Sequence, residues 1–182
     1  MRKILWAMAA AAALCGCAGP GGRHGAAPER HSVTQFPWGS PIAFAGMSFD
    51  FHSARNTDAF TNWMNQPTHA DANFLIVDVT MTNRTGAPLE PRSQPIFRLV
   101  DDRGTFYEPS EAHTATINLN RPGRLESGAA MNPNTAVRKE FVFDVPRGHY
   151  RLGVVVPDQA PVVFAGDVLS RGPYFYVALP GV

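Results

Sequence analysis

Residues 73–83 read Asn-Phe-Leu-Ile-Val-Asp-Val-Thr-Met-Thr-Asn, and their pattern indicates the fold class. Its side chains alternate between two faces with a period of two, which is the period of a β-strand with one buried face. The apolar face carries Leu75, Val77, Val79 and Met81, and the polar face carries Asp78, Thr80 and Thr82. The stretch therefore predicts a half-buried strand.

The same alternation recurs later in the chain, in Phe141, Phe143 and Val145 and again in Leu152, Val154 and Val156. Shorter strands are expected at residues 42–51, 96–100, 105–107, 116–119, 162–165 and 174–179. Turn residues separate them, as in 102–104 (Asp-Arg-Gly) and 121–124 (Arg-Pro-Gly-Arg), where Gly supplies a positive φ. Short strands with such punctuation predict an all-β, immunoglobulin-like antiparallel β-sandwich over residues 41–182.

One segment, residues 56–66, departs from this alternation. Asp58 can cap a helix, and Phe60, Trp63 and Met64 recur at helical spacing. We therefore expect a short helix here, and two roles stay open for it. It closes one end of the sandwich, or its Trp63 forms part of an aromatic interaction surface.

The C-terminal strand expected at residues 174–179 has aromatic side chains on both faces. It follows Gly172-Pro173 and precedes Pro180-Gly181, which limits its pairing and predicts a short strand at a sheet edge. Tyr174 and Tyr176 are therefore candidate interaction residues. The alternative is that they pack on the chain around Phe36 and Trp38.

The N-terminus has the three parts of a secretory signal: basic Arg2 and Lys3, an apolar run over residues 4–14, and a small residue before a cut. The apolar run is shorter than the roughly 20 residues of a membrane-spanning helix. Residues 14–17 (Leu-Cys-Gly-Cys) resemble the bacterial lipobox. That resemblance implies removal of residues 1–16 and lipidation of Cys17. Ala18, in place of Asp, then favours the outer membrane facing the periplasm in a Gram-negative cell.

Residues 17–40 are rich in Gly and Pro and predict a flexible linker behind the lipidated Cys17. The remaining length suits one domain. Without Arg2 and Lys3 the chain has 14 basic and 15 acidic residues, a formal charge of −1. No basic field would attract nucleic acid.

No enzyme signature occurs in the sequence, and we expect a protein that is not an enzyme and uses no cofactor. With Cys15 removed and Cys17 modified, no thiol remains for catalysis or a disulfide. The histidines lack ligand spacing, so we expect no metal site. Asp101, Asp102 and Glu108 are interpreted as solvated turn residues rather than a cation site.

The strand series resembles the immunoglobulin-like domain of unknown function that follows many bacterial lipoprotein signals and is similar to small secreted immunogenic proteins. The resemblance rests on residues 73–83, 97–104 (Phe-Arg-Leu-Val-Asp-Asp-Arg-Gly), 107–110 (Tyr-Glu-Pro-Ser) and 141–146 (Phe-Val-Phe-Asp-Val-Pro). It implies a β-sandwich with no agreed enzymatic activity and no site residues to transfer. We therefore expect a membrane-anchored envelope lipoprotein with a non-catalytic interaction or assembly domain. Its partner would be an envelope protein or polymer. A lipoprotein that binds a small ligand or metal through the Trp63 region is the alternative.

Overall fold

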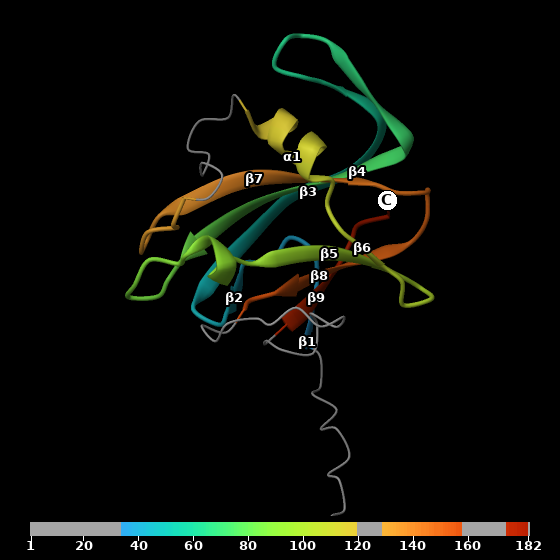
Figure 1. Ribbon diagram of the computed structural model, residues 1–182. Helices are drawn as coiled ribbons and strands as arrows, with labels where there is room; N and C mark the ends of the chain where they lie inside the picture. Colours follow the sequence, from blue (N-terminus) through green and yellow to red (C-terminus); the bar gives the residue numbers. More distant parts are fainter. Residues whose placement is uncertain (1–33, 120–128, 158–173, 182) are drawn as a thin grey trace, which may run out of the picture. The chain divides into compact units, whose positions relative to one another are not determined.

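Two facing β-sheets form the fold in the computed structural model, which describes residues 34–119, 129–157 and 174–181 (Figure 1). The strand order is β1-β9-β8-β5-β6 in one sheet and β2-β3-β4-β7 in the other. The strands are β1 (Thr34–Phe36), β2 (Ile42–Phe44), β3 (Met47–Thr61), β4 (Pro67–Asn83), β5 (Ile96–Asp101), β6 (Phe106–Tyr107), β7 (Ala136–Asp144), β8 (Tyr150–Val155) and β9 (Tyr174–Ala178). A 3₁₀ turn, η1 (Pro91–Ser93), and one helix, α1 (Glu111–Asn118), complete the described elements. All strand pairs except β1–β9 are antiparallel, so the predicted all-β sandwich is confirmed.

The core lies between the two sheets and consists of the side chains that the period-two pattern placed inward. Every member of the three alternating series is buried in one cluster: Leu75, Val77, Val79, Met81, Phe141, Phe143, Val145, Leu152, Val154 and Val156. Aromatic rings fill the centre, with the Phe49 and Phe175 centroids 5.3 Å apart and the Phe97 and Phe141 rings stacked at 4.2 Å. The alternation therefore predicted the inward face of each of these strands. The prediction that β4 is only half buried is wrong, because Phe74 and Ile76 on its other face are buried in a second cluster and Asp78 is only 4% exposed.

Strand β1 lies in the segment that the sequence assigned to the linker. It pairs in parallel with β9, so β9 lies between β1 and β8 and the prediction that it is an edge strand is wrong. The ring of Phe36 meets Phe175 edge-on at 5.3 Å, and Trp38 contacts Phe51 at 5.7 Å. The inward-facing Phe175, rather than either tyrosine, therefore packs against the chain that follows the tether.

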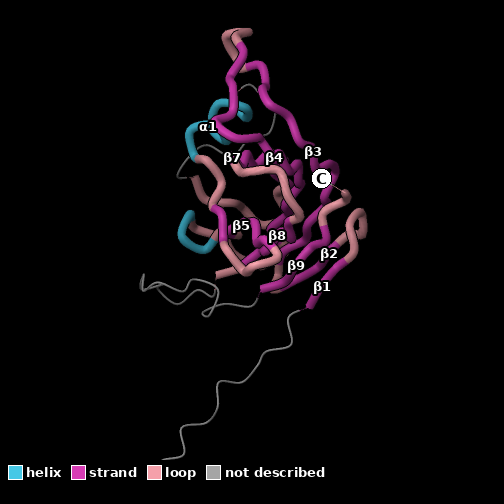
Figure 2. Tube along the Cα trace, turned by 90° about the vertical axis from the view of Figure 1, so that its right-hand side faces the viewer, coloured by secondary structure: helices cyan, strands magenta, loops and turns pink. Residues whose placement is uncertain are grey.

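The helix expected at residues 56–66 does not form. Strand β3 continues to Thr61 and β4 begins at Pro67, so most of the segment is the outer half of a long hairpin. The two strands stay paired as far as Thr61 opposite Pro67, with register shifts near Phe51 and Thr57. Continuous strand pairing thus outweighs the helical spacing of three apolar residues. The hairpin projects beyond the sandwich (Figure 2).

Residues 116–118, expected in a strand, belong instead to α1, which covers the edge strand β7. The Ser110 amide donates to the Val142 carbonyl at 2.8 Å, and the Val142 amide donates to Thr114 Oγ1 at 3.0 Å. Asn118 accepts from the Glu140 amide at 2.9 Å and donates to the Glu140 carbonyl at 2.7 Å. The Ser110 amide and the side chains of Thr114 and Asn118 thereby satisfy the backbone groups that a neighbouring strand would otherwise bond.

The turn predicted at residues 102–104 is present, with φ of 83° at Gly104. Asp101 Oδ1 accepts bonds from the amides of Arg103 and Thr105 at 2.9 and 2.8 Å. These two bonds lower the pKa of Asp101, because they favour the charged carboxylate. The strand expected at 162–165 and the turn at 121–124 lie outside the described residues.

Candidate functional site

The tip of the β3–β4 hairpin exposes two large apolar side chains. Trp63 is 53% exposed and Met64 is 51% exposed, more than any other large hydrophobic residue in the described part of the chain. The loop that carries them is closed by Asn62, whose Oδ1 accepts from the amides of Met64 and Gln66, both at 3.0 Å. The Asn62 amide donates to the Gln66 carbonyl at 2.8 Å, and Asn65 has a positive φ of 62°. The loop therefore presents Trp63 and Met64 on a hydrogen-bonded turn.

The outer half of the hairpin rests on α1 through an aromatic contact. The Phe60 ring lies 5.2 Å from Phe74 and 6.2 Å from the His113 ring, and Phe74 and His113 lie 4.8 Å apart. His113 Nδ1 in turn lies 3.0 Å from Ser110 Oγ, at the start of the helix. Phe60, which the sequence grouped with Trp63, thus fixes the hairpin to the domain.

Tyr174 and Tyr176 lie on the outer face of the five-stranded sheet and are partly buried. Their ring centroids are 6.0 Å apart, and the Arg151 guanidinium lies 4.9 Å from the Tyr176 centroid. Tyr176 also covers Gly153, where a Cβ would come within 3.2 Å of its ring. Burial raises the pKa of Tyr176, the charge of Tyr174 adds to the rise, and Arg151 opposes it.

The structure does not bring these tyrosines together with Trp63. The hairpin tip lies at the top of Figure 1, whereas β9 lies near the bottom. Cys17 and the signal peptide lie outside the described residues. Within the described part of the chain, no helix has the length and apolarity needed to cross a membrane.

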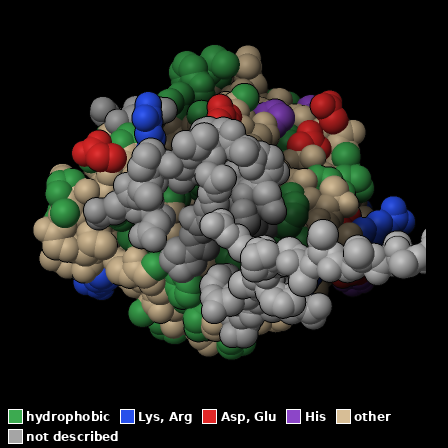
Figure 3. Space-filling view, turned by 60° about the horizontal axis from the view of Figure 1, so that its bottom comes forward, with side chains coloured by type: hydrophobic (Ala, Val, Ile, Leu, Met, Phe, Trp, Pro, Cys, Tyr) green, Lys and Arg blue, Asp and Glu red, His purple; other side chains and the backbone are tan. Residues whose placement is uncertain are grey.

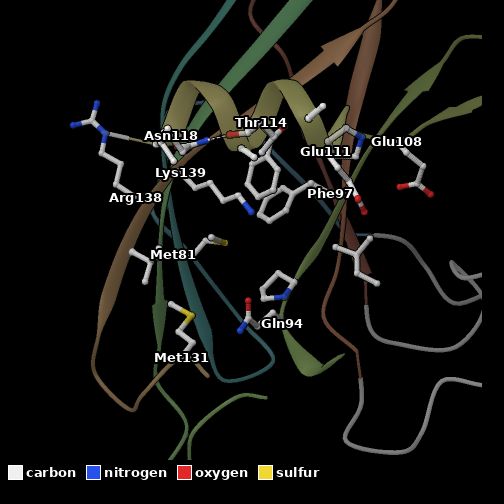
Figure 4. Close-up of a pocket in the computed structure, with 18 residues that line it drawn as sticks. Met81, Gln94, Phe97, Glu108, Glu111, Thr114, Asn118, Met131, Arg138 and Lys139 are labelled. Carbon is white, nitrogen blue, oxygen red and sulfur yellow. Dashed lines mark hydrogen bonds between the residues drawn. The ribbon is translucent and has the colours of Figure 1, made fainter. Parts of the chain in front are cut away.

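A cavity of about 1110 Å³ opens between β5, β7 and α1 (Figure 4). Most of its wall is apolar, with Met81, Phe97, Met131, Val137 and Phe141 toward the core. Polar and charged residues line the rest of it: Gln94, Glu108, Glu111, Thr114, Asn118, Arg138 and Lys139. The cavity is large enough for a small organic molecule.

Lys139 extends into this cavity toward the Phe97 ring, whereas the Arg138 guanidinium is directed away from that ring (Figure 4). The Lys139 ammonium lies 4.9 Å from the Phe141 centroid. Burial lowers the pKa of Lys139, and the charge of Glu111 partly opposes this effect. The sequence could have indicated this arrangement, because Lys139 alternates with Val137, Phe141 and Phe143 and so lies on the same, inward-facing side of the strand.

Other charged residues do not gather into a site. In the described residues, no group of three potential metal ligands lies close enough to hold an ion. On the face shown in Figure 3, acidic and basic side chains outside the grey regions lie apart rather than in a patch of one sign.

A model of the family described as "Domain of unknown function (DUF4352)" matches residues 36–164. The chain belongs to this family. The match covers both sheets from the end of β1 to β8, and so includes the hairpin, α1 and the cavity. A search of curated proteins returns no match.

Two solved structures share the fold of this DUF4352 domain. A conserved hypothetical protein of Bacillus anthracis has a TM-score of 0.56 at 13% identity, over 65% of this chain and 89% of its own. The yjhA protein of Bacillus subtilis has a TM-score of 0.55 at 18% identity, over 79% of this chain and 99% of its own. At these identities the likeness establishes the fold alone.

Proposed function

We propose that this DUF4352 protein is a lipid-anchored component of the bacterial envelope whose sandwich is a non-catalytic interaction module. The lipobox at residues 14–17 and the secretory signal before it support the anchor on Cys17. Two or more acyl chains give stable anchoring where one would be marginal. In a Gram-negative cell, Ala18 favours the outer membrane facing the periplasm.

The observation that carries the interaction role is the exposed pair Trp63 and Met64 on a turn fixed by Asn62. Tryptophan is enriched among the residues that dominate binding energy at protein interfaces. A loop whose backbone is already fixed by hydrogen bonds loses less entropy on binding than a flexible one. The tip therefore suits a protein partner that offers an apolar pocket.

The first strand of the domain and the hairpin tip lie far apart. Strand β1, the first described element after residue 33, lies at the opposite end of the domain from the hairpin tip (Figure 1). The 16 residues from 18 to 33 could extend to about 55 Å at most. A partner in the aqueous space of the envelope could reach the tip while Cys17 stays in the membrane.

A lipid bilayer is the less favoured target of the tip. The loop reads Asn62-Trp63-Met64-Asn65-Gln66 and carries no charge, so it lacks the Lys and Arg that attract anionic lipid surfaces. Two side chains alone also bury little apolar area. We therefore place a protein, rather than a membrane, at the tip.

Site-specific photo-crosslinking from position 65 of the lipidated protein, in cells, tests the tip. A defined crosslinked protein should form with the native tip and be lost when Trp63→Ser and Met64→Ser are combined. Phe106→Ser is the matched control, because Phe106 is another exposed aromatic residue, at 44%, on β6. Equal crosslinking in both variants would refute the tip as the interface. Crosslinking to lipid alone would point to the bilayer instead.

The anchor has a separate test. Cys17→Ser should abolish incorporation of a labelled fatty acid and leave an unprocessed precursor, because the thioether needs the Cys17 sulfur. Continued labelling of this variant would refute the lipoprotein assignment. A second candidate function, small-ligand binding, is favoured by the cavity between β5 and β7 rather than by the Trp63 region.

A further inference from the structure

The cavity beside α1 has few polar groups available to a ligand. Thr114 Oγ1 is engaged by the Val142 amide, and the Asn118 amide group bonds Glu140 and Thr114. Gln94 Nε2 donates to the Ala129 carbonyl at 2.8 Å. These groups hold the walls in place and leave the apolar surface and the charged residues to meet a ligand.

The charged residues of the cavity differ in their partners. Glu108 pairs with Arg98, and Arg138 forms two bonds with Asp78, at 3.0 and 2.8 Å. Lys139 differs, because no carboxylate among the described residues lies within salt-bridge distance of its ammonium. Glu111 raises its pKa through charge alone and forms no ion pair with it.

The environment of Lys139 favours an incoming anion. Its ammonium is partly desolvated against the stacked Phe97 and Phe141 rings, a cost that lowers its pKa. A cation–π contact offsets some of that cost, but an aromatic ring accepts no ordinary hydrogen bond, and no carboxylate among the described residues pairs with the ammonium. A carboxylate placed beside Nζ would supply both the opposite charge and the acceptors.

We propose that this cavity binds a small organic acid with one carboxylate and an apolar body. The carboxylate pairs with Lys139, and the apolar body lies along Phe97, Met81 and Met131. A cationic ligand is disfavoured beside Nζ, because Lys139 repels it, Glu108 is already paired with Arg98, and the charge of Glu111 already acts on Lys139. A neutral apolar ligand would leave the Lys139 ammonium without its partner.

The sequence allows a direct probe of this site. Protein produced from residue 18 onward contains a single lysine, Lys139. Reductive methylation with ¹³C-formaldehyde keeps the positive charge and labels only Lys139 and the amino terminus. The terminus is recognised by its ordinary pKa of about 7.7–8.0.

Two carboxylates, decanoate and 4-phenylbutyrate, are added in separate titrations that distinguish an aliphatic from an aromatic ligand. Decanol and decylammonium are the matched uncharged and cationic probes. Either carboxylate should shift the Lys139 signal saturably and raise the pH at which it titrates. The reason is that a bound carboxylate adds its negative charge to those of Glu111 and Glu108 and so stabilises the charged ammonium form. Saturable shifts with neither carboxylate, or decylammonium binding as tightly as decanoate, would refute the proposal.

Calorimetry on variants completes the test. Lys139→Met should weaken carboxylate binding about tenfold or more, because hydrogen bonds to charged groups are the stronger ones. Lys139→Arg keeps the charge and should retain most of the affinity, and Arg103→Gln, which removes a charge far from the cavity, should change nothing. Equal affinity of Lys139→Met and the native protein would show that the ammonium does not hold the ligand. These results do not depend on the hairpin tip or the lipid anchor.

Discussion

The two ends of the β3–β4 hairpin carry large apolar residues in opposite settings. At the base, Phe49, Phe51 and Val79 are buried between the sheets. At the tip, Trp63 and Met64 are each about half exposed, on a turn that Asn62 fixes. One pair of strands thus joins the core of the domain to a surface that contributes no core packing.

This difference separates residues that stabilise the fold from residues available to a partner. Burial of an aromatic side chain contributes roughly 1.5–3 kcal/mol to stability, and an exposed one contributes little of this. An exposed Trp gains that energy only when a partner covers it. The comparison predicts that substitutions at the base change stability, whereas substitutions at the tip change binding.

The largest effect is expected in the core beside the hairpin base. Phe143 is fully buried and lies opposite Leu75 in the β4–β7 register. Phe143→Ala should cost about 3–5 kcal/mol, because it removes the ring and leaves a cavity. Denaturant titration should show a much lower midpoint. The control Phe106→Ala, at an exposed aromatic, should hardly shift it, and equal shifts would contradict the assignment of the core.

The sequence predicted the core well, because the alternation in β4, β7 and β8 extends over several residues with apolar side chains on one face. It failed at β1, since three residues are too few to show a period, and pairing with β9 defines that strand. It also failed at Phe60, Trp63 and Met64. Their helical spacing has no structural meaning, because Phe60 is still paired in β3, which ends at Thr61, whereas Trp63 and Met64 lie in the loop.

Helix α1 was missed for a different reason. It lacks a continuous apolar face: Ile117 packs against the cluster that contains Val142, but the helix is otherwise joined to β7 by hydrogen bonds, so hydrophobic periodicity cannot reveal it. The residues of the two candidate sites also differ in how far the sequence could reveal them. Trp63 could be singled out by residue type alone, whereas the role of Lys139 required its register in β7 and the position of the helix above it.

Asn118 tests whether α1 protects the β7 edge, and we expect the second-largest effect there. Asn118→Ala leaves the buried amide and carbonyl of Glu140 without their side-chain partners, at a cost of about 1–3 kcal/mol. Hydrogen exchange at the Glu140 amide should accelerate. Thr116→Ala is the control, because the Thr116 hydroxyl bonds only the Ala112 carbonyl within the helix and the residue is only partly buried. Unchanged exchange at Glu140 would mean that the helix does not protect this edge.

Tyr176 should give a smaller loss of stability than Asn118. Because the ring is only partly buried over Gly153 and Arg151, Tyr176→Ser should cost about 1 kcal/mol. Tyr174→Ser, on the same face, is the companion variant. Thermal unfolding measures both. A loss near that of Phe143→Ala would place Tyr176 in the core, and no loss at all would leave the tyrosines available as a surface.

The smallest effect is expected at the hairpin tip. Trp63→Ser should change stability by no more than about 0.5 kcal/mol, because the side chain has few contacts to lose and the backbone bonds to Asn62 remain. Asn62→Ala is the informative contrast, since it removes both side-chain bonds that close the loop while keeping Trp63. If the fixed turn is what prepares Trp63 for a partner, Asn62→Ala should weaken crosslinking although the indole is intact. Full crosslinking by Asn62→Ala would show that the partner needs only the exposed indole, and a large stability loss in Trp63→Ser would show that the tip belongs to the fold after all.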